Sequence, residues 1–283
     1  MIQIIAESIN DSVPTTNALF EAGDTEGVVE LAKSQAADPR TAYVDVNVGI
    51  RDPSFMGDLV RAIQKQVAAT PLSIDSPDFE IAKAGLAAYD DAAGKPILNS
   101  ISPLRLSLFD LLDVRPFRPI LLATENLKDV EEMPCTTVEE TVAAARLLVE
   151  EAHRRGIANE DCIIDPGISP IGADTDGQIH RLMGSMRANH EDPFFAGVHM
   201  SVGLSNFTVM LPTVKESDGT PVKTPLANAF LTRAMPLGLD MSIASVKRKY
   251  ATLAEGDPAL VCFDECLTLE GFDVIMRVQE FCS

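Results

Sequence analysis

Eight short runs of apolar, β-prone residues recur along the chain, and segments with helical spacing separate them. The runs are Ile2–Ala6, Ala42–Val48, Leu72–Asp75, Pro96–Asn99, Pro119–Ala123, Cys162–Asp165, Gly197–Val202 and Leu239–Ala244. Most of them are apolar at consecutive positions, which is typical of parallel strands covered on both faces. Strands that alternate with helices form a closed barrel or an open doubly wound sheet, and a count of eight favours closure. We therefore expect an α/β fold, a (β/α)8 TIM barrel.

Capping residues precede several of the intervening helices. Asp24-Thr25-Glu26 and Thr136-Thr137-Val138-Glu139 both have a side-chain cap followed by an acidic first turn. The longest irregular stretch, Leu211–Thr224, follows the seventh run, and we expect it to overhang the mouth of the barrel. The length of 283 residues is ordinary for such a barrel, and the chain contains no linker rich in Pro or Ser. We expect residues 1–283 to form a single domain.

The charge balance excludes several classes of partner. The chain carries 23 basic and 42 acidic residues, a formal net charge of −19. Nucleic acid and anionic membrane surfaces would repel such a protein. No basic segment precedes an apolar stretch at the N-terminus, and no apolar run approaches the roughly 20 residues that span a bilayer. We expect a cytoplasmic protein that binds neither nucleic acid nor membrane.

The cysteines predict no structural cross-link. Their number, five, is odd, so we expect reduced thiols. Cys262 and Cys266 would share one face of a helix, but no His or second Cys pair accompanies them. We expect no metal site there.

Polar residues end four of the apolar runs. Asp75, Asn99 and Asp165 end the third, fourth and sixth runs, and Asn206 follows the seventh. In a barrel the carboxyl ends of the strands and the loops after them form the site. An ionised carboxylate accepts two parallel hydrogen bonds from an amino-amide edge, so these groups suit a neutral heterocycle rich in N–H donors. Each alone could cap a helix or pair loop backbone, but four at one end favour a binding site.

The same segments carry a family resemblance. The matching motifs are Tyr43–Gly49, Leu72–Ser76, Glu80–Leu86, Ile97–Ile101, Ile164–Gly167, Val202–Asn206, Asn228–Met235 and Gly238–Ile243. They resemble those of the pterin-binding barrels, the dihydropteroate synthase-like family. Within it, they are most similar to the methyltetrahydrofolate:corrinoid protein methyltransferases of one-carbon metabolism.

The resemblance implies a function and a set of site residues. Asp75, Asn99 and Asp165 would hold the pterin ring, and Asn206 would be the catalytic group near the methyl-bearing nitrogen. Gly203 and Ser205 would belong to the substrate-binding loop that carries Asn206. The enzyme would be a methyltransferase, and the resemblance allows it a place in an O-demethylase or glycine betaine demethylase system. It would move a methyl group between tetrahydrofolate and the cobalamin of a separate corrinoid protein, and it would be a homodimer.

Some features depart from the resemblance or leave alternatives open. Related enzymes often have a Gln three residues after the Asn, where this chain has Val209. The last run reads Asp240-Met-Ser-Ile243, without the Arg-x-His of dihydropteroate synthase, so that activity is disfavoured. The Asp-x-His-x-x-Gly motif with which many corrinoid proteins bind cobalamin is missing, so the cobalt must arrive on a partner. A tetrahydromethanopterin-dependent methyltransferase stays open, as does the direction of transfer.

Charged residues outside these motifs are weaker candidates. His199 within the seventh run and His153 near a helix end are expected to be structural. Arg233 and the Lys247-Arg248-Lys249 run could meet the glutamate tail of folate, although a solvated helix face is the commoner interpretation of such a run.

Overall fold

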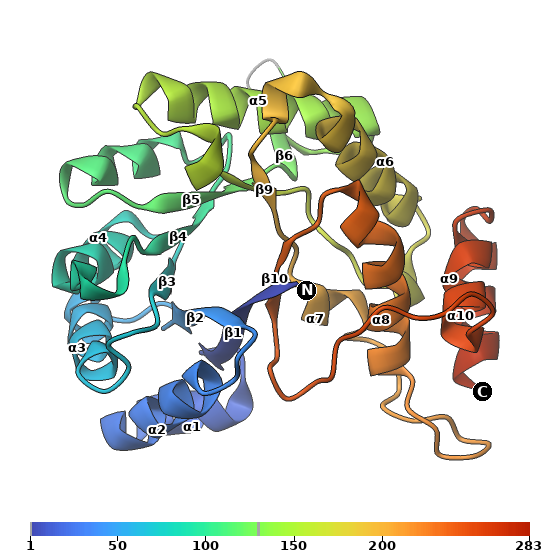
Figure 1. Cartoon of the computed structure of the whole chain (residues 1–283), viewed down its shortest axis with the longest axis horizontal. Coiled ribbons are helices and arrows are strands. Elements are labelled where there is room, and N and C mark those ends of the chain that lie inside the picture. The colour runs from blue at the N-terminus through green and yellow to red at the C-terminus, as the bar shows by residue number, and fades with distance from the viewer. Residues whose placement is uncertain (1, 129–130) are drawn as a thin grey trace.

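The computed structural model describes residues 2–128 and 131–283, and its main feature is an eight-stranded parallel sheet. The strands are β1 (Gln3–Asn10), β2 (Thr41–Asn47), β3 (Leu72–Asp75), β4 (Ile97–Ile101), β5 (Arg118–Leu122), β8 (Ile163–Asp165), β9 (His199–Met200) and β10 (Met241–Ala244). They are ordered β10-β1-β2-β3-β4-β5-β8-β9. The two ends of the sheet meet just beyond β9, where Ile243 N–H donates to the Val202 carbonyl at 3.0 Å. The predicted TIM-barrel fold is confirmed (Figure 1).

Helices cover the outside of this barrel (Figure 1). They are α1 (Pro14–Glu21), α2 (Thr25–Ala36), α3 (Pro53–Gln64), α4 (Phe79–Ala88), α5 (Val138–Arg154), α6 (Gln178–Glu191), α7 (Leu204–Phe207), α8 (Lys223–Ala234), α9 (Pro258–Cys266) and α10 (Phe272–Cys282). Short 3-10 helices include Leu106–Asp113, which takes the place of an α-helix between β4 and β5. The predicted caps are present. Asp24 accepts a hydrogen bond from Gly27 N–H, and Thr137 forms a capping box with Glu140. In the described ranges, no helix combines the length and apolarity needed to cross a membrane.

Residues of alternating character on β2 show how the barrel separates its two faces. Val44 and Val46 are fully buried in the apolar layer between the strands and the outer helices. Asp45 lies between them in sequence and points to the opposite face, because successive side chains of a strand alternate. The inner face is therefore free to carry polar groups while the outer face holds the helices.

The inner face is mostly apolar in its amino-terminal half. Six strands contribute one buried side chain each to a compact cluster: Ile5, Tyr43, Ile97, Ile120, Ile163 and Met241. Barrel interiors are filled by such layers of side chains. This layer fills the amino-terminal part of the interior, and the polar inward positions lie above it, toward the carboxyl ends of the strands.

Some expected boundaries differ from the structure. β1 continues to Asn10, beyond the predicted end at Ala6, while β9 contains only His199 and Met200. The antiparallel pair β6 (Glu125–Lys128) and β7 (Glu131–Pro134) was not expected. The extension of β1 matters most, because it brings further polar residues to the mouth.

The long loop Leu211–Thr224 does not overhang the mouth as expected. Val214 pairs with Pro221 in an isolated bridge, and the Lys215 ammonium lies 4.4 Å from the centre of the Phe281 ring on α10. Figure 1 shows the loop extending outward from the barrel toward the C-terminal helices. The expectation failed because the bridge folds the loop back on itself and the cation–π contact holds it against the outer helices.

Candidate active site

The cavity at the mouth lies one layer above the apolar cluster. Side chains two positions apart on a strand share a face, so each strand of the cluster presents its next inward residue nearer its carboxyl end. These residues are Glu7, Asp45, Asn99, Leu122, Asp165 and Ile243, and all line one cavity of about 680 Å³. Ligand pockets commonly have volumes of this order. The cavity therefore has the place and size expected of a barrel's active site.

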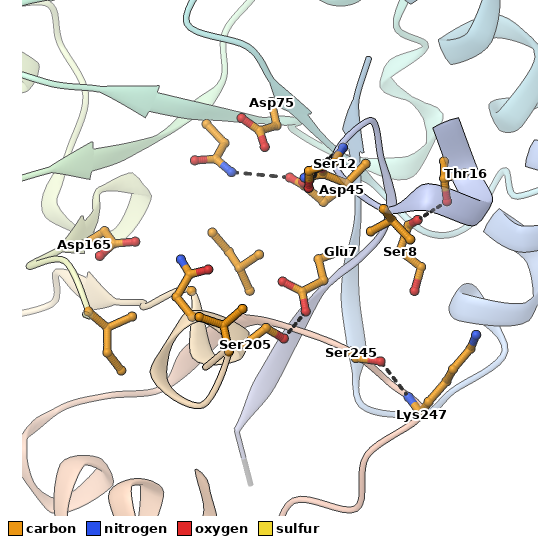
Figure 2. A pocket seen from close by; sticks show the side chains of 18 of the residues that line it. Glu7, Ser8, Ser12, Thr16, Asp45, Asp75, Asp165, Ser205, Ser245 and Lys247 are labelled. Carbon is orange, nitrogen blue, oxygen red and sulfur yellow. Dashed lines mark hydrogen bonds between the residues drawn. The ribbon is translucent and has the colours of Figure 1, made fainter. Parts of the chain in front are cut away.

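All of the site residues predicted from the sequence meet at this cavity. Its lining includes the six predicted residues Asp75, Asn99, Asp165, Gly203, Ser205 and Asn206. They come from β3, β4, β8 and the segment after β9, which are far apart in the chain. Figure 2 shows Asp75, Asp165 and Glu7 directed toward a common space.

Asp45 and Asp75 form a buried acidic pair on neighbouring strands. Asn47 Nδ2 donates to Asp75 Oδ2 at 2.9 Å, and Asn99 Nδ2 donates to Asp45 Oδ1 at 3.5 Å. Burial raises the pKa of Asp75 to about 6, against the opposing effect of its bonds to Asn47 and Asp45. Burial and the charge of Asp75 raise the pKa of Asp45 well above its ordinary range. Asp45 therefore holds the proton of the pair, and Asp75 is the better acceptor for a ligand.

Asp165 is fixed by the turn that follows it. Its Oδ1 accepts a hydrogen bond from Gly167 N–H at 2.7 Å. Gly167 has φ +73°, and a Cβ there would lie 2.0 Å from a side-chain carbon of Thr124, so only glycine fits. The buried guanidinium of Arg181 donates to the carbonyls of Pro166 and Gly167 at 2.7 and 3.0 Å. Burial raises the pKa of Asp165 to about 6, while the Gly167 N–H and the Arg181 charge oppose that rise.

The short helix α7 places Ser205 and Asn206 at the mouth. Leu204 and Phe207 are buried, and their spacing of three residues directs them to the same side of the helix turn. Ser205 and the exposed Asn206 consequently face the cavity. A Cβ on Gly203 would lie 3.0 Å from Asn206 Nδ2, so the glycine leaves room for the carboxamide. Within residues 2–128 and 131–283, the Asn206 carboxamide has no hydrogen-bond partner, and it is free to meet a ligand.

Glu7 joins β1 to this helix turn. Ser205 Oγ donates to Glu7 Oε1, as Figure 2 shows. Burial raises the pKa of Glu7, and the hydrogen bond from Ser205 and the charge of Arg248 counteract part of that rise. Glu7 thereby connects the loop that carries Asn206 to the rigid sheet.

The site can act as both acceptor and donor of hydrogen bonds. Its four carboxyl groups lie in one desolvated cavity, which disfavours the simultaneous ionisation of all of them. Ionised carboxylates accept from N–H groups, whereas protonated ones donate to carbonyl or ring-nitrogen acceptors. Among the described lining residues, Lys247 is the one cationic side chain. Such a lining suits an uncharged heterocycle with alternating donors and acceptors better than a phosphate.

Sequence reasoning missed Glu7, Asp45 and Arg181. The signal for Asp45 was present, because it interrupts an otherwise apolar strand between Val44 and Val46. Glu7 was missed because the first run was taken to end one residue earlier. Arg181 gave no signal, since its role depends on α6 packing under the turn after β8.

Several other charged residues lie outside the site. His199 Nδ1 lies 2.6 Å from Asp240 Oδ2, and these residues stand at the amino-terminal ends of β9 and β10, opposite the mouth. Arg233 is engaged by Asp264 and Glu255 at 2.6 to 3.0 Å, and is not available to a ligand tail. Cys262 and Cys266 are buried on α9.

Comparison with known proteins agrees with this architecture. The family model described as "Pterin binding enzyme" matches residues 33–245. A curated relative, the methylcorrinoid:tetrahydrofolate methyltransferase of Eubacterium limosum, is 27% identical over 255 residues, covering 85% of this chain and 83% of that protein.

Solved structures show the same fold at lower identity. Dihydropteroate synthase from Xanthomonas albilineans, determined with 4-aminobenzoic acid, superposes with a TM-score of 0.53 at 19% identity, covering 94% of this chain and 89% of that one. The Yersinia pestis dihydropteroate synthase, in a sulfonamide complex, gives 0.52 at 13% identity, covering 98% and 92%. Because the family model spans most of the chain, including β2, β3, β4 and β8 with Asp45, Asp75, Asn99 and Asp165, the protein belongs to the pterin-binding enzyme family.

Proposed function

We propose that this protein moves a methyl group between tetrahydrofolate and the cobalt of a separate corrinoid protein. The observation that carries the proposal is the meeting of Asp75, Asn99, Asp165 and Asn206 around one cavity at the carboxyl ends of the strands. The name of the Eubacterium limosum relative, a methylcorrinoid:tetrahydrofolate methyltransferase, supports the same chemistry.

Asp75, Asn99 and Asp165 hold the pterin ring in this proposal. The ring presents an amino-amide edge, which donates parallel hydrogen bonds to a carboxylate. Asp75 and Asp165 have pKa values of about 6, so both are largely ionised at neutral pH and accept such bonds. Asn99 supplies a group that donates and accepts, which complements the mixed polarity of the ring.

Asn206 acts on the nitrogen that carries the methyl group. Methyl transfer is a displacement in which this nitrogen leaves, and the nitrogen leaves more readily when it is protonated or hydrogen-bonded. A carboxamide can donate or accept, so it stays bonded as the nitrogen changes its protonation without itself titrating. The surrounding carboxyl groups favour positive charge on the ring during this change. Holding the methyl between nitrogen and cobalt contributes the remaining acceleration through positioning.

The cobalt is carried by a partner protein. This chain lacks the Asp-x-His-x-x-Gly motif with which many corrinoid proteins bind cobalamin. The exposed apolar side chains of Val209 and Met210 follow Asn206 at the mouth, where a partner would have to bring the cobalt. Exposed apolar residues beside a polar site suit a surface that another protein covers.

The test is a methyl-transfer assay with purified components. The full chain is mixed with Co(I) cobalamin and methyltetrahydrofolate, and the methylcobalamin spectrum is followed; the reverse reaction starts from methylcobalamin and tetrahydrofolate. We expect transfer in at least one direction. Methyltetrahydromethanopterin serves as the competing substrate. The proposal would be refuted if calorimetry shows that the protein binds the folate but no methyl transfer occurs in either direction, with free corrinoid or with a corrinoid protein. The protein would then be a pterin-binding protein without this activity.

A further inference from the structure

The cavity continues from its acidic end into an arm with different chemistry. Asp45, Asp75 and Asp165 lie at the acidic end, on β2, β3 and β8. The arm is lined by Ser8, Ser12, Thr15, Thr16, Ser245 and Lys247, and we call it the hydroxyl arm. Figure 2 shows Asp165 on one side of the view and Ser8, Thr16, Ser245 and Lys247 on the other. The arm has hydroxyl groups and a cation where the acidic end has carboxyl groups.

Side chains form hydrogen bonds with backbone groups along one wall of the hydroxyl arm. Thr16 Oγ1 donates to the Ser8 carbonyl at 2.7 Å, and Ser8 N–H donates to Gln35 Oε1 at 2.8 Å. Both Thr16 and Gln35 are buried, on α1 and α2 respectively. The extended end of β1 is thus held in place, and the arm has an ordered wall before any ligand arrives.

On the other wall, the Arg40 guanidinium fixes the loop that carries Lys247. Arg40 Nη2 donates to the Val246 carbonyl at 2.7 Å, and Arg40 Nη1 donates to the Arg248 carbonyl at 2.8 Å. These are the carbonyls on either side of Lys247. Arg40 is itself held by Asp38 through two bonds of 2.7 and 2.8 Å. The backbone at Lys247 is therefore pinned at the rim of the cavity, although its side chain is exposed.

The ammonium of Lys247 is available for a ligand. Across the described ranges it has neither an ion pair nor a hydrogen bond, and only its backbone N–H is engaged, by Ser245. Its basic neighbour Arg248 donates instead to Thr208 Oγ1 at 3.2 Å. Arg51, another cation on the mouth side, is paired with Asp11 and Glu21. An unpaired cation at the edge of an acidic cavity fits an anionic group of the ligand that the acidic end would repel.

We propose that Lys247, with the hydroxyl arm, binds a carboxylate of the glutamyl tail of folate. This inference rests on the proposed function and adds a specificity-determining residue to it. The acidic end favours the donor-rich ring and repels carboxylates, whereas the cation of the hydroxyl arm attracts a carboxylate. The two ends thereby orient the ligand, with its ring at the centre of the barrel and its tail over the loop after β10.

Calorimetry with three ligands tests the proposal on the full-length protein. The ligands are methyltetrahydrofolate, its triglutamate form and a tailless 5-methyltetrahydropterin. An exposed ion pair of about 0.2–1 kcal/mol corresponds to roughly a 1.5- to 5-fold change in affinity. We expect Lys247→Gln to weaken binding of methyltetrahydrofolate by that factor and Lys247→Glu to weaken it further, with larger losses for the triglutamate. Both variants should bind the tailless pterin as the unsubstituted protein does. The tail's contribution should shrink in roughly 0.5 M salt, because exposed charges are screened.

Lys249→Gln is the matched control. Lys249 is exposed, belongs to the same basic run and is absent from the cavity lining, so its loss changes net charge equally without touching the arm. The proposal would be overturned if Lys247→Gln and Lys249→Gln lose the same affinity for methyltetrahydrofolate, or if Lys247→Gln loses none. It would also be overturned if Lys247→Gln weakens binding of the tailless pterin as much as binding of methyltetrahydrofolate. If neither folate nor the tailless pterin binds the unsubstituted protein, both the tail inference and the proposed function are refuted. If both support methyl transfer and the Lys247 variants match the unsubstituted protein, only the tail inference fails.

Discussion

Replacing Asp165 by Asn should stabilise the protein while impairing the site. Burial raises the pKa of Asp165 from its ordinary 3.8 to about 6. The folded protein therefore holds this proton more tightly than the unfolded chain, and ionisation of Asp165 costs stability as the pH rises from about 4 through about 6. Asn has nearly the same shape, never ionises, and its oxygen can still accept from Gly167 N–H.

The size of the effect follows from the shift. A difference of about two pKa units corresponds to about 3 kcal/mol, which is the upper bound on the gain at about pH 8. At about pH 5 the folded-state carboxyl is mostly protonated, and the same shift leaves roughly half of that gain. Pterin binding should weaken about tenfold or more in the same variant, because a neutral amide replaces a charged acceptor worth roughly 1.5–3 kcal/mol.

Urea unfolding followed by circular dichroism at the two pH values measures the gain, and calorimetry measures the binding. Asp174→Asn is the control: the buried Asp174 accepts from Gln178 and Ile179 N–H groups at 2.8 Å each, outside the cavity lining. Asn can accept only one of these bonds, so this variant should lose about 1 kcal/mol and bind pterin normally. If Asp165→Asn is less stable than the unsubstituted protein at about pH 8, or gains equally at both pH values, the account of its buried charge is wrong.

Three further outcomes are expected. Asp75→Ala should weaken methyltetrahydrofolate binding at least about tenfold in calorimetry, since it removes a charged acceptor worth roughly 1.5–3 kcal/mol. An unchanged affinity would show that Asp75 does not bind the pterin ring. Asn206→Ala should raise the barrier to single-turnover methyl transfer by about 2–4 kcal/mol at saturating folate, with a smaller effect on binding. A change confined to the dissociation constant would make Asn206 a binding residue only. We also propose a homodimer, which sedimentation at micromolar concentration tests; a single species near 30.5 kDa would contradict it.

The sequence by itself determined the barrel and the four polar residues around which the site is proposed. Consecutive apolar residues in runs such as Pro119–Ala123 predict parallel strands buried on both faces, and polar residues that end other runs, such as Asp75 and Asp165, predict the mouth. Asp75, Asn99, Asp165 and Asn206 could be identified in this way, because the carboxyl ends of parallel strands meet on one rim whatever the details of packing. Their convergence on one cavity follows from topology, which the periodicity of the chain encodes.

The tertiary structure alone decided which other groups join them. Glu7 reaches the mouth because β1 continues past Ala6, and that extension depends on pairing with β2 up to Asn47, at the other end of a long connection. Arg181 and Arg40 act through backbone carbonyls of distant segments, contacts that leave no local pattern in the sequence. The raised pKa values of Asp75 and Asp165 likewise come from desolvation in the assembled cavity. Local sequence specifies strands and their faces, whereas desolvation and contacts across the barrel exist only once the sheet has closed.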